Sequence, residues 1–260
     1  YGTKKSLYTV PINDNVLVCI YDLEQCPISF NVFEFLAAFN FEAVARKKRF
    51  FFVVLDQKIG KNISFGSFAG SYSVESREYR LRNLIALACA LFPACAGYSL
   101  LYSRDMIDSF LSGYEIFPSS YDPHYLISNQ LFIYDSFRPY VQAGQQFASL
   151  TVPAYALEIA NKVVRDLTDM QVITITLRMS KYDEVRNSCL SEWAQFASYA
   201  SGLGYKVVVI PDSDNPTEYY PISDHFIYNL FCHNLELRAA IYELAVCNLG
   251  VSNGPMILST

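Results

Sequence analysis

The chain has 260 residues, of which 52% are hydrophobic and 17% charged, so it can bury the cores of one or two domains and is not a disordered chain. A formal net charge of -5 creates no overall positive field, and we therefore expect no nucleic acid partner. Every long apolar stretch is interrupted by charges, which predicts no membrane-spanning helix and at most peripheral membrane association.

The first half begins with a βαβ pattern. A short apolar run at 15–21 predicts a strand, helical spacing follows at 31–48, and a second apolar run follows at 49–55. Further along, we expect a Gly/Ser-rich loop at 60–73, helices at 76–92 and 105–111, and strands at 98–102, 114–117 and 131–134. Residues 119–152 otherwise show no clear pattern.

A helix predicted at 153–167 connects the two halves, because Pro153 suits a first helical position. The strand and helix alternation then resumes, with strands at 172–177, 205–210 and 248–252 and helices at 188–202 and 235–246. This alternation predicts an α/β fold of two Rossmann-like, doubly wound parallel-sheet domains, at 1–152 and 153–260. The sequence stops just after the start of another helix, so we expect the second domain to continue beyond it.

Cysteine and histidine usage bears on location and on metals. The seven cysteines are scattered mostly through apolar segments without a CxxC pair, as is typical of reduced core thiols, so we expect a cytoplasmic protein. No signal-peptide pattern marks the N-terminus for secretion. His124, His225 and His233 lie far apart and form no cluster with the cysteines, so no metal or cofactor is predicted.

Because ligands bind at the carboxyl ends of parallel strands, the strand-to-helix turns are the candidate sites. The first turn carries Asp22 and Glu24, two carboxylates of which one is a candidate general base for a hydroxyl group. The alternative is that either residue caps a helix or pairs with a nearby cation.

The second turn spans 177–188 and joins a strand to a helix. Its three cations are Arg178, Lys181 and Arg186, and Asn187 and Ser188 lie where a helix cap is expected. Open N–H groups at a helix start, together with arginine, favour a diphosphate. The alternative is a solvated loop in which Arg186 pairs with Asp183 or Glu184.

The third turn follows the last strand and contains Ser252, Asn253 and Gly254, small residues that leave backbone N–H groups accessible to a phosphate or sugar. An ordinary strand-to-helix turn also explains them. The acidic turn 212–214 is a weaker candidate for a divalent ion or a ribose. The glycine-rich stretch fits neither the dinucleotide nor the P-loop pattern, and no GxSxG motif occurs.

Several of these segments, in this order, resemble bacterial proteins of surface-polysaccharide synthesis that are treated as GT-B-like glycosyltransferases. They are DLEQCPISFNVFEFLAAF (22–39), ITITLR (173–178), EVRNS (184–188), Trp193 and VVVIPD (207–212). The ending SNGPM (252–256) is similar to the nucleotide-sugar-binding turn of heptosyltransferases, which usually reads SND(S/T)GPMH. Here the acidic and hydroxyl residues before the glycine are absent, and Ile257 replaces the histidine.

The resemblance implies two domains that face each other across a cleft. The second domain would bind a nucleotide-diphosphate sugar and the first a glycan or lipid-linked acceptor, with helix dipole and arginine replacing a metal. In that scheme Asp22 or Glu24 deprotonates the acceptor, while Arg178, Arg186 and the N–H groups of Asn187 and Ser188 stabilise the leaving diphosphate. The alternatives are a nucleotide-sugar epimerase or hydrolase, and a non-catalytic nucleotide-sugar-binding or scaffold protein.

Overall fold

The computed structural model describes residues 15–56, 74–123, 138–144, 150–167, 169–181, 183–213, 220–222 and 226–259. The chain divides into two compact units: unit 1 comprises Tyr1–Gly70 and Ala88–Ser149, and unit 2 comprises Ser71–Leu87 and Leu150–Thr260. Unit 2 thus includes Ser71–Leu87, which the sequence pattern assigned to the first domain at 1–152. The strand expected at 131–134 and the loop expected at 60–73 fall outside the described residues.

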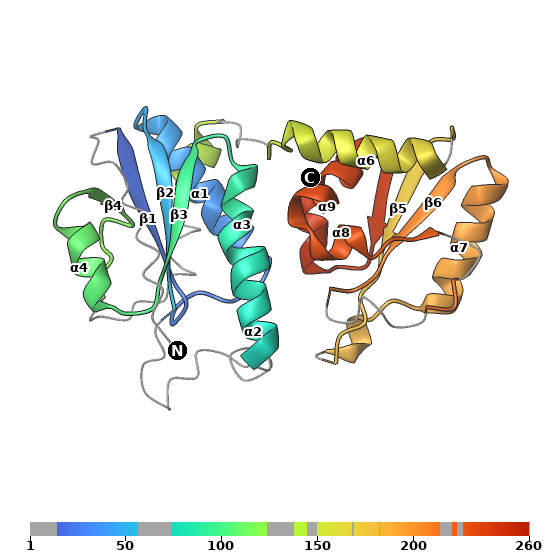
Figure 1. Ribbon diagram of the computed structural model, residues 1–260, viewed down its shortest axis with the longest axis horizontal. Coiled ribbons are helices and arrows are strands. Elements are labelled where there is room, and N and C mark those ends of the chain that lie inside the picture. Colours follow the sequence, from blue (N-terminus) through green and yellow to red (C-terminus); the bar gives the residue numbers. More distant parts are fainter. Residues whose placement is uncertain are drawn as a thin grey trace. The chain divides into compact units, whose positions relative to one another are not determined.

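Unit 1 is built on a four-stranded parallel sheet in the order β3-β2-β1-β4 (Figure 1). Its strands are β1 (Val16–Asp22), β2 (Arg49–Leu55), β3 (Cys95–Leu101) and β4 (Glu115–Phe117). Strand β3 begins three residues before the predicted strand, because Cys95 and Gly97 pair with β2 although their small side chains carry no strand pattern.

Two helices of unit 1 cover opposite faces of its sheet. Helix α1 (Val32–Ala45) packs Phe35 and Phe39 against aromatic side chains of β1 and β2. Helix α4 (Asp105–Leu111) buries Ile107 against the other face, with Val18 and Ile20 of β1. Since side chains alternate along a strand, the continuous apolar run of β1 supplies both cores.

The segment predicted as a helix at 76–92 is helical from Val74 to Leu91, but it changes its helix type along the way. It consists of α2 (Val74–Arg80), the π-helix η1 (Leu81–Ile85), α3 (Ala86–Ala88) and the 3-10 turn η2 (Cys89–Leu91). The π turn could not be seen in the sequence, because its buried residues Leu81, Leu84 and Ile85 keep ordinary α-helical spacing.

Unit 2 repeats the same topology, with its parallel strands in the order β7-β6-β5-β8. These strands are β5 (Val172–Thr176), β6 (Lys206–Ile210), β7 (Phe226–Ile227) and β8 (Cys247–Gly250). Strand β7 and helix α8 (Leu230–His233) were not predicted, because two and four residues are too short to show a period.

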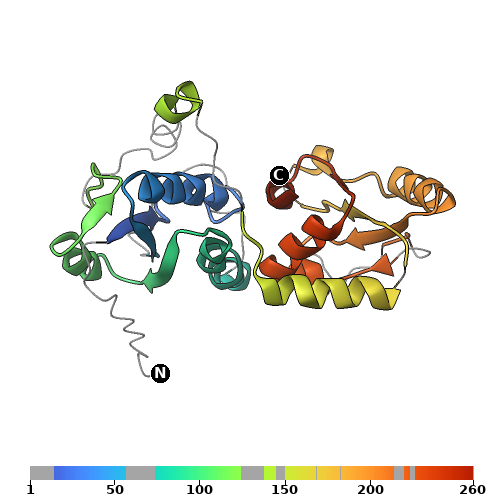
Figure 2. The same cartoon turned by 90° about the horizontal axis from the view of Figure 1, so that it is seen from above.

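Helices lie on both sides of this second sheet as well. Figure 2 shows α6 (Ala154–Leu167) and α9 (Leu235–Leu244) on one side and α7 (Leu190–Gly202) on the other. Helix α6 packs against α9, and Tyr155 donates a hydrogen bond to Glu236. The chain ends in the 3-10 helix η4 (Gly254–Ser259), close to the expected helix start.

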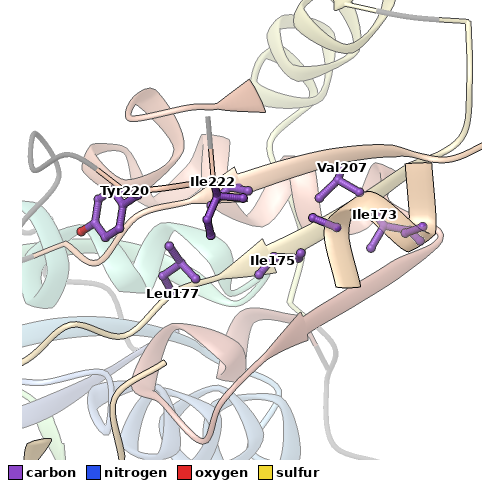
Figure 3. Close-up of a cluster of buried hydrophobic side chains, with 9 residues drawn as sticks. Ile173, Ile175, Leu177, Val207, Tyr220 and Ile222 are labelled. Carbon is purple, nitrogen blue, oxygen red and sulfur yellow. The ribbon is translucent and has the colours of Figure 1, made fainter. Parts of the chain in front are cut away.

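The core beneath α7 is aliphatic. Ile173, Ile175 and Leu177 project from one face of β5 and its extension, and they meet Val207 of β6 together with Tyr220 and Ile222 (Figure 3). Their spacing of two residues is the strand period, so one face of β5 faces α7 and the other faces α9.

The predicted α/β fold with parallel sheets is confirmed, whereas the expected cleft stays a prediction. Within the described ranges, no helix combines the length and apolar character needed to cross a membrane.

Candidate functional site

Both sheets have a topological switch point, where neighbouring strands carry crossovers that run in opposite directions. In unit 1 it lies between β1 and β4, and in unit 2 it lies between β5 and β8. Crevices at the carboxyl ends of strands beside such a point are the usual ligand sites of open parallel sheets. The turns that follow β1, β5 and β8 are the three turns selected from the sequence.

In unit 1 the switch point is occupied by a buried charge cluster around Asp22, the last residue of β1. The Asp22 side chain is fully buried, and its Oδ2 accepts hydrogen bonds from Arg104 Nη2 at 2.8 Å and Tyr121 OH at 2.9 Å. Its Oδ1 accepts the backbone N–H of Glu24 at 3.0 Å. The Glu24 carboxylate pairs with the same Arg104 nitrogen, so one guanidinium holds both predicted carboxylates.

This clustering shifts the ionisation of the two partners. Burial by itself lowers the pKa of Arg104, but the carboxylates of Asp22 and Glu24 outweigh it and raise that pKa above its ordinary value. Burial and the neighbouring Asp22 raise the pKa of Tyr121 well above its ordinary value. Tyr121 therefore stays a neutral donor and Arg104 a cation, and both hold Asp22 in place rather than leave it open to a substrate.

The turn after β5 is ordered by its own polar side chains. Arg178 is buried, and its Nη1 donates to the carbonyl of Asp183 at 2.8 Å and to Asn187 Oδ1 at 2.7 Å. Asn187 also bonds both backbone groups of Ser180, at 2.9 Å each. Arg178 thus shapes this turn from within, which is a different use from the direct diphosphate contact expected from the sequence.

Two backbone N–H groups that were expected to bind the diphosphate already donate hydrogen bonds within the turn. The N–H of Asn187 donates to the carbonyl of Glu184, and that of Ser188 donates to the carbonyl of Arg178, both at 2.9 Å. The expectation of open N–H groups there is therefore wrong, because α7 begins only at Leu190, with Cys189 as a cap that makes no side-chain bond. Lys181 and Arg186 remain exposed cations of the turn.

Arg186 joins this turn to the one after β8, 66 residues further along the chain. Its Nη2 donates to the carbonyl of Ser252 at 2.7 Å, and the predicted pair with Asp183 is present but long, at 3.5 Å. In the same turn, Asn253 Oδ1 accepts the N–H of Met256 at 3.2 Å and so caps η4, which starts at Gly254. The second and third candidate turns therefore lie side by side at the β5 and β8 ends, as one candidate site.

Gly250, the last residue of β8, lies so close to β5 and to Met256 that there is no room for a side chain. A Cβ at Gly250 would lie 3.0 Å from the backbone oxygen of Thr176 and 3.0 Å from Met256 Sδ. We expect Gly250→Ala to lower the free energy of unfolding by about 1–3 kcal/mol, because the β5 backbone cannot move aside freely. Urea unfolding measures this change. The control Gly202→Ala, in an open helical position, should instead be neutral or slightly stabilising, and equal effects of both variants would contradict the packing argument.

Sequence reasoning missed Arg104 and Tyr121. Arg104 follows the predicted strand at 98–102, so the carboxyl-end rule could have selected it, whereas Tyr121 lies where no element was assigned. Asp212, a weak candidate, lies beside the site of unit 2, because its Oδ2 accepts the N–H of Met179 at 2.8 Å. Asp214 lies outside the described residues, and within them no group of three or more potential ligand side chains is suited to a metal ion.

No family model and no curated protein matches this chain. Among solved structures, it is similar to ADP-heptose lipopolysaccharide heptosyltransferase II of E. coli, with a TM-score of 0.58 and 8% identity over 94% of this chain and 81% of that one. It also aligns with a family 9 glycosyl transferase of Veillonella parvula (TM-score 0.49, 14% identity, 96% and 78% covered) and with an iron-containing dodecameric glycosyltransferase of enterotoxigenic E. coli (TM-score 0.44, 14% identity, 95% and 55% covered). The similarity to the E. coli heptosyltransferase II confirms the heptosyltransferase-like resemblance of the sequence at the level of the fold.

Proposed function

We propose that the chain is a glycosyltransferase that moves a sugar from a nucleotide-diphosphate donor to a hydroxyl of a glycan or lipid-linked acceptor. Unit 2 would bind the donor and unit 1 the acceptor. The fold similar to a heptosyltransferase supports the reaction class. The observation that carries the proposal is the hydrogen bond between Arg186 and the Ser252 carbonyl, which unites two turns at the switch point of unit 2.

The charges at this site suit a diphosphate leaving group. Arg186 and Lys181 are exposed cations beside the β5 end, and the start of α7, a helix of thirteen residues, follows the same turn. Guanidinium and ammonium groups stabilise the charge that develops on a departing diphosphate, and a helix start adds to this effect. We therefore propose that the transfer needs no metal. We also propose that the protein acts in the cytoplasm, with at most peripheral membrane association.

The acceptor side rests on the Asp22 cluster. For the hydroxyl to lose its proton, a carboxylate must lie within hydrogen-bond reach of it. Within this cluster the Glu24 carboxylate pairs with Arg104, whereas Asp22 accepts hydrogen bonds from Arg104, Tyr121 and the backbone N–H of Glu24. Glu24 is therefore less engaged than Asp22. We propose Glu24 before Asp22 as the base, with Arg104 orienting both.

Arg186→Ala tests the donor site. Loss of one charge-assisted contact should weaken binding of the cognate nucleoside diphosphate about tenfold, which corresponds to about 1.4 kcal/mol. Calorimetry with ADP, UDP, GDP and CDP measures it, and ADP comes first because the similar E. coli enzyme is described with ADP-heptose. Arg165→Ala, which removes an exposed arginine of α6, is the control. Unchanged affinity in the Arg186 variant would refute the phosphate role.

A second candidate function is nucleotide-sugar binding without turnover. It is favoured by the full engagement of Asp22, whose two oxygens already accept three hydrogen bonds. Incubation of the protein with a labelled nucleotide sugar and a mixed acceptor pool separates the possibilities. A new glycoside indicates transfer, free sugar or an epimer indicates a hydrolase or epimerase, and binding without any product indicates a binding protein.

A further inference from the structure

Arg238 is a buried cation that the sites described above do not use. It lies one turn into α9, its side chain is 1% exposed, and it is the largest fully buried side chain of the described residues. Its Nε donates to the carbonyl of Phe231 in α8 at 2.7 Å, whereas its buried Nη2 has no hydrogen-bond partner. No carboxylate of the described residues forms an ion pair with it.

Such an arrangement is costly in a ligand-free protein. A guanidinium stays protonated under all ordinary conditions, and a buried charge without a counter-ion carries a desolvation penalty that only an opposite charge relieves. A sequence that needed Arg238 only for packing would be served as well by methionine or leucine. Among the residues that the structure describes, none supplies the opposite charge in an ion pair, so we expect a ligand to supply it.

The position of Arg238 indicates where that ligand lies. Helical side chains tilt toward the helix N-terminus, and Tyr242, one turn further along, reaches Thr176 Oγ1 at the carboxyl end of β5 at 2.6 Å. Arg238 starts one turn nearer the helix N-terminus and bonds to the Phe231 carbonyl of α8, from which we infer that its guanidinium lies near the carboxyl end of β5. The thiol of Cys232 lies near this group: burial raises its pKa, the charge of Arg238 lowers it, and the Asp212 charge raises it.

We propose that Arg238 is the buried counter-charge of a diphosphate bound at the carboxyl end of β5 in unit 2, and that it selects anionic over neutral ligands. This inference rests on the proposed donor site and adds a positioning residue to it. Charges interact more strongly through the protein interior than through water and are screened less by salt. Arg238 therefore attracts the anion through space, together with the N-terminus of α9, whose first turn is capped by Asn234.

The test is calorimetric titration of the full chain with inorganic pyrophosphate, and separately with the nucleosides adenosine and uridine. We expect Arg238→Gln to weaken pyrophosphate binding at least tenfold while nucleoside binding stays within twofold. Arg165→Gln, which removes an exposed arginine from α6, should change pyrophosphate binding less than twofold. Without ligand, Arg238→Met should melt within about 2 °C of the wild type, because methionine fills the site without an unpaired charge.

Each result has a defined meaning. Unchanged pyrophosphate affinity in folded Arg238→Gln, or no pyrophosphate binding by the wild type, overturns the inference. If neither variant folds, hydrogen exchange of the wild type decides: pyrophosphate should slow exchange in 230–238, and no protection there overturns the inference. Arg238-dependent pyrophosphate binding without binding of any nucleotide sugar refutes the proposed function alone, whereas nucleotide-sugar binding that ignores Arg238 refutes the inference alone.

Discussion

Asp22→Ala is expected to lower the free energy of unfolding by about 3 kcal/mol, because it leaves a buried cation without its main counter-charge. Arg104 is buried and would retain its bonds to Glu24 and to the Pro123 carbonyl, while Tyr121 would lose the hydrogen bond that it donates to Asp22. Asp22→Asn keeps the shape and removes the charge, so its cost should be smaller, about 1–2 kcal/mol. Urea unfolding followed by far-UV circular dichroism measures both variants.

Asp108→Ala is the matched control, since Asp108 is an exposed carboxylate of α4 in the same unit. Its effect should stay below about 0.5 kcal/mol. The same variants decide between a structural carboxylate and a catalytic base. If Asp22→Asn unfolds like the wild type but product formation from a labelled nucleotide sugar disappears, Asp22 is the base and its structural role has been overestimated.

The sequence predicted the fold well where a strand is buried on both faces. The apolar runs that became β1, β2, β5 and β6 read as strands because no position along them had to face water. Alternation with helices then required parallel pairing. The short β7 and α8 escaped notice because their formation depends on neighbours: β7 exists because β6 offers it an edge.

The candidate turns could be selected from the sequence because the strands that precede them were predicted. A rule about the carboxyl ends of strands selects turns, and three selected turns lie at the two switch points. It does not say which way a side chain turns inside a loop. Arg178 and Ser188 looked like ligand groups, but the Arg178 guanidinium bonds to the Asp183 carbonyl and to Asn187. The hydroxyl and N–H of Ser188 bond to the backbone of Arg178.

Arg238 is the reverse case, a residue whose sequence pattern suggests the surface but which is buried. In a helix with alternating polar and apolar residues, an arginine is assigned to the solvent face, yet this one is buried. Only the packing of α9 against β5 and α8 reveals it, because a helical pattern leaves the direction of a long side chain open. Buried charges of this kind are therefore where a structure adds most to the reading of a sequence.

The turn after β5, which we propose to bind the nucleotide-sugar donor, is tested by Asn187→Ala. This variant should lower the free energy of unfolding by about 2–3 kcal/mol and weaken pyrophosphate binding at least tenfold. The variant removes three hydrogen bonds, one from Arg178 and two with the backbone of Ser180. A guanidinium and a backbone N–H that lose an acceptor in a partly buried turn each carry a penalty of about 1–3 kcal/mol, offset where water enters.

Glu184→Ala is the control, because Glu184 is exposed in the same turn and should change neither quantity appreciably. Binding is expected to fall along with stability because Arg186 and Lys181 project from the segment that Asn187 holds to Ser180, and a disordered segment must be ordered again when the ligand binds. Asn187→Ala with lowered stability but wild-type affinity would show that the anion is bound elsewhere, by the turn after β8 and the through-space attraction of Arg238. In this scheme the anion binds only when the turn after β5 is ordered. The polar side chains of this turn contribute mainly by keeping Arg186 bonded to the Ser252 carbonyl.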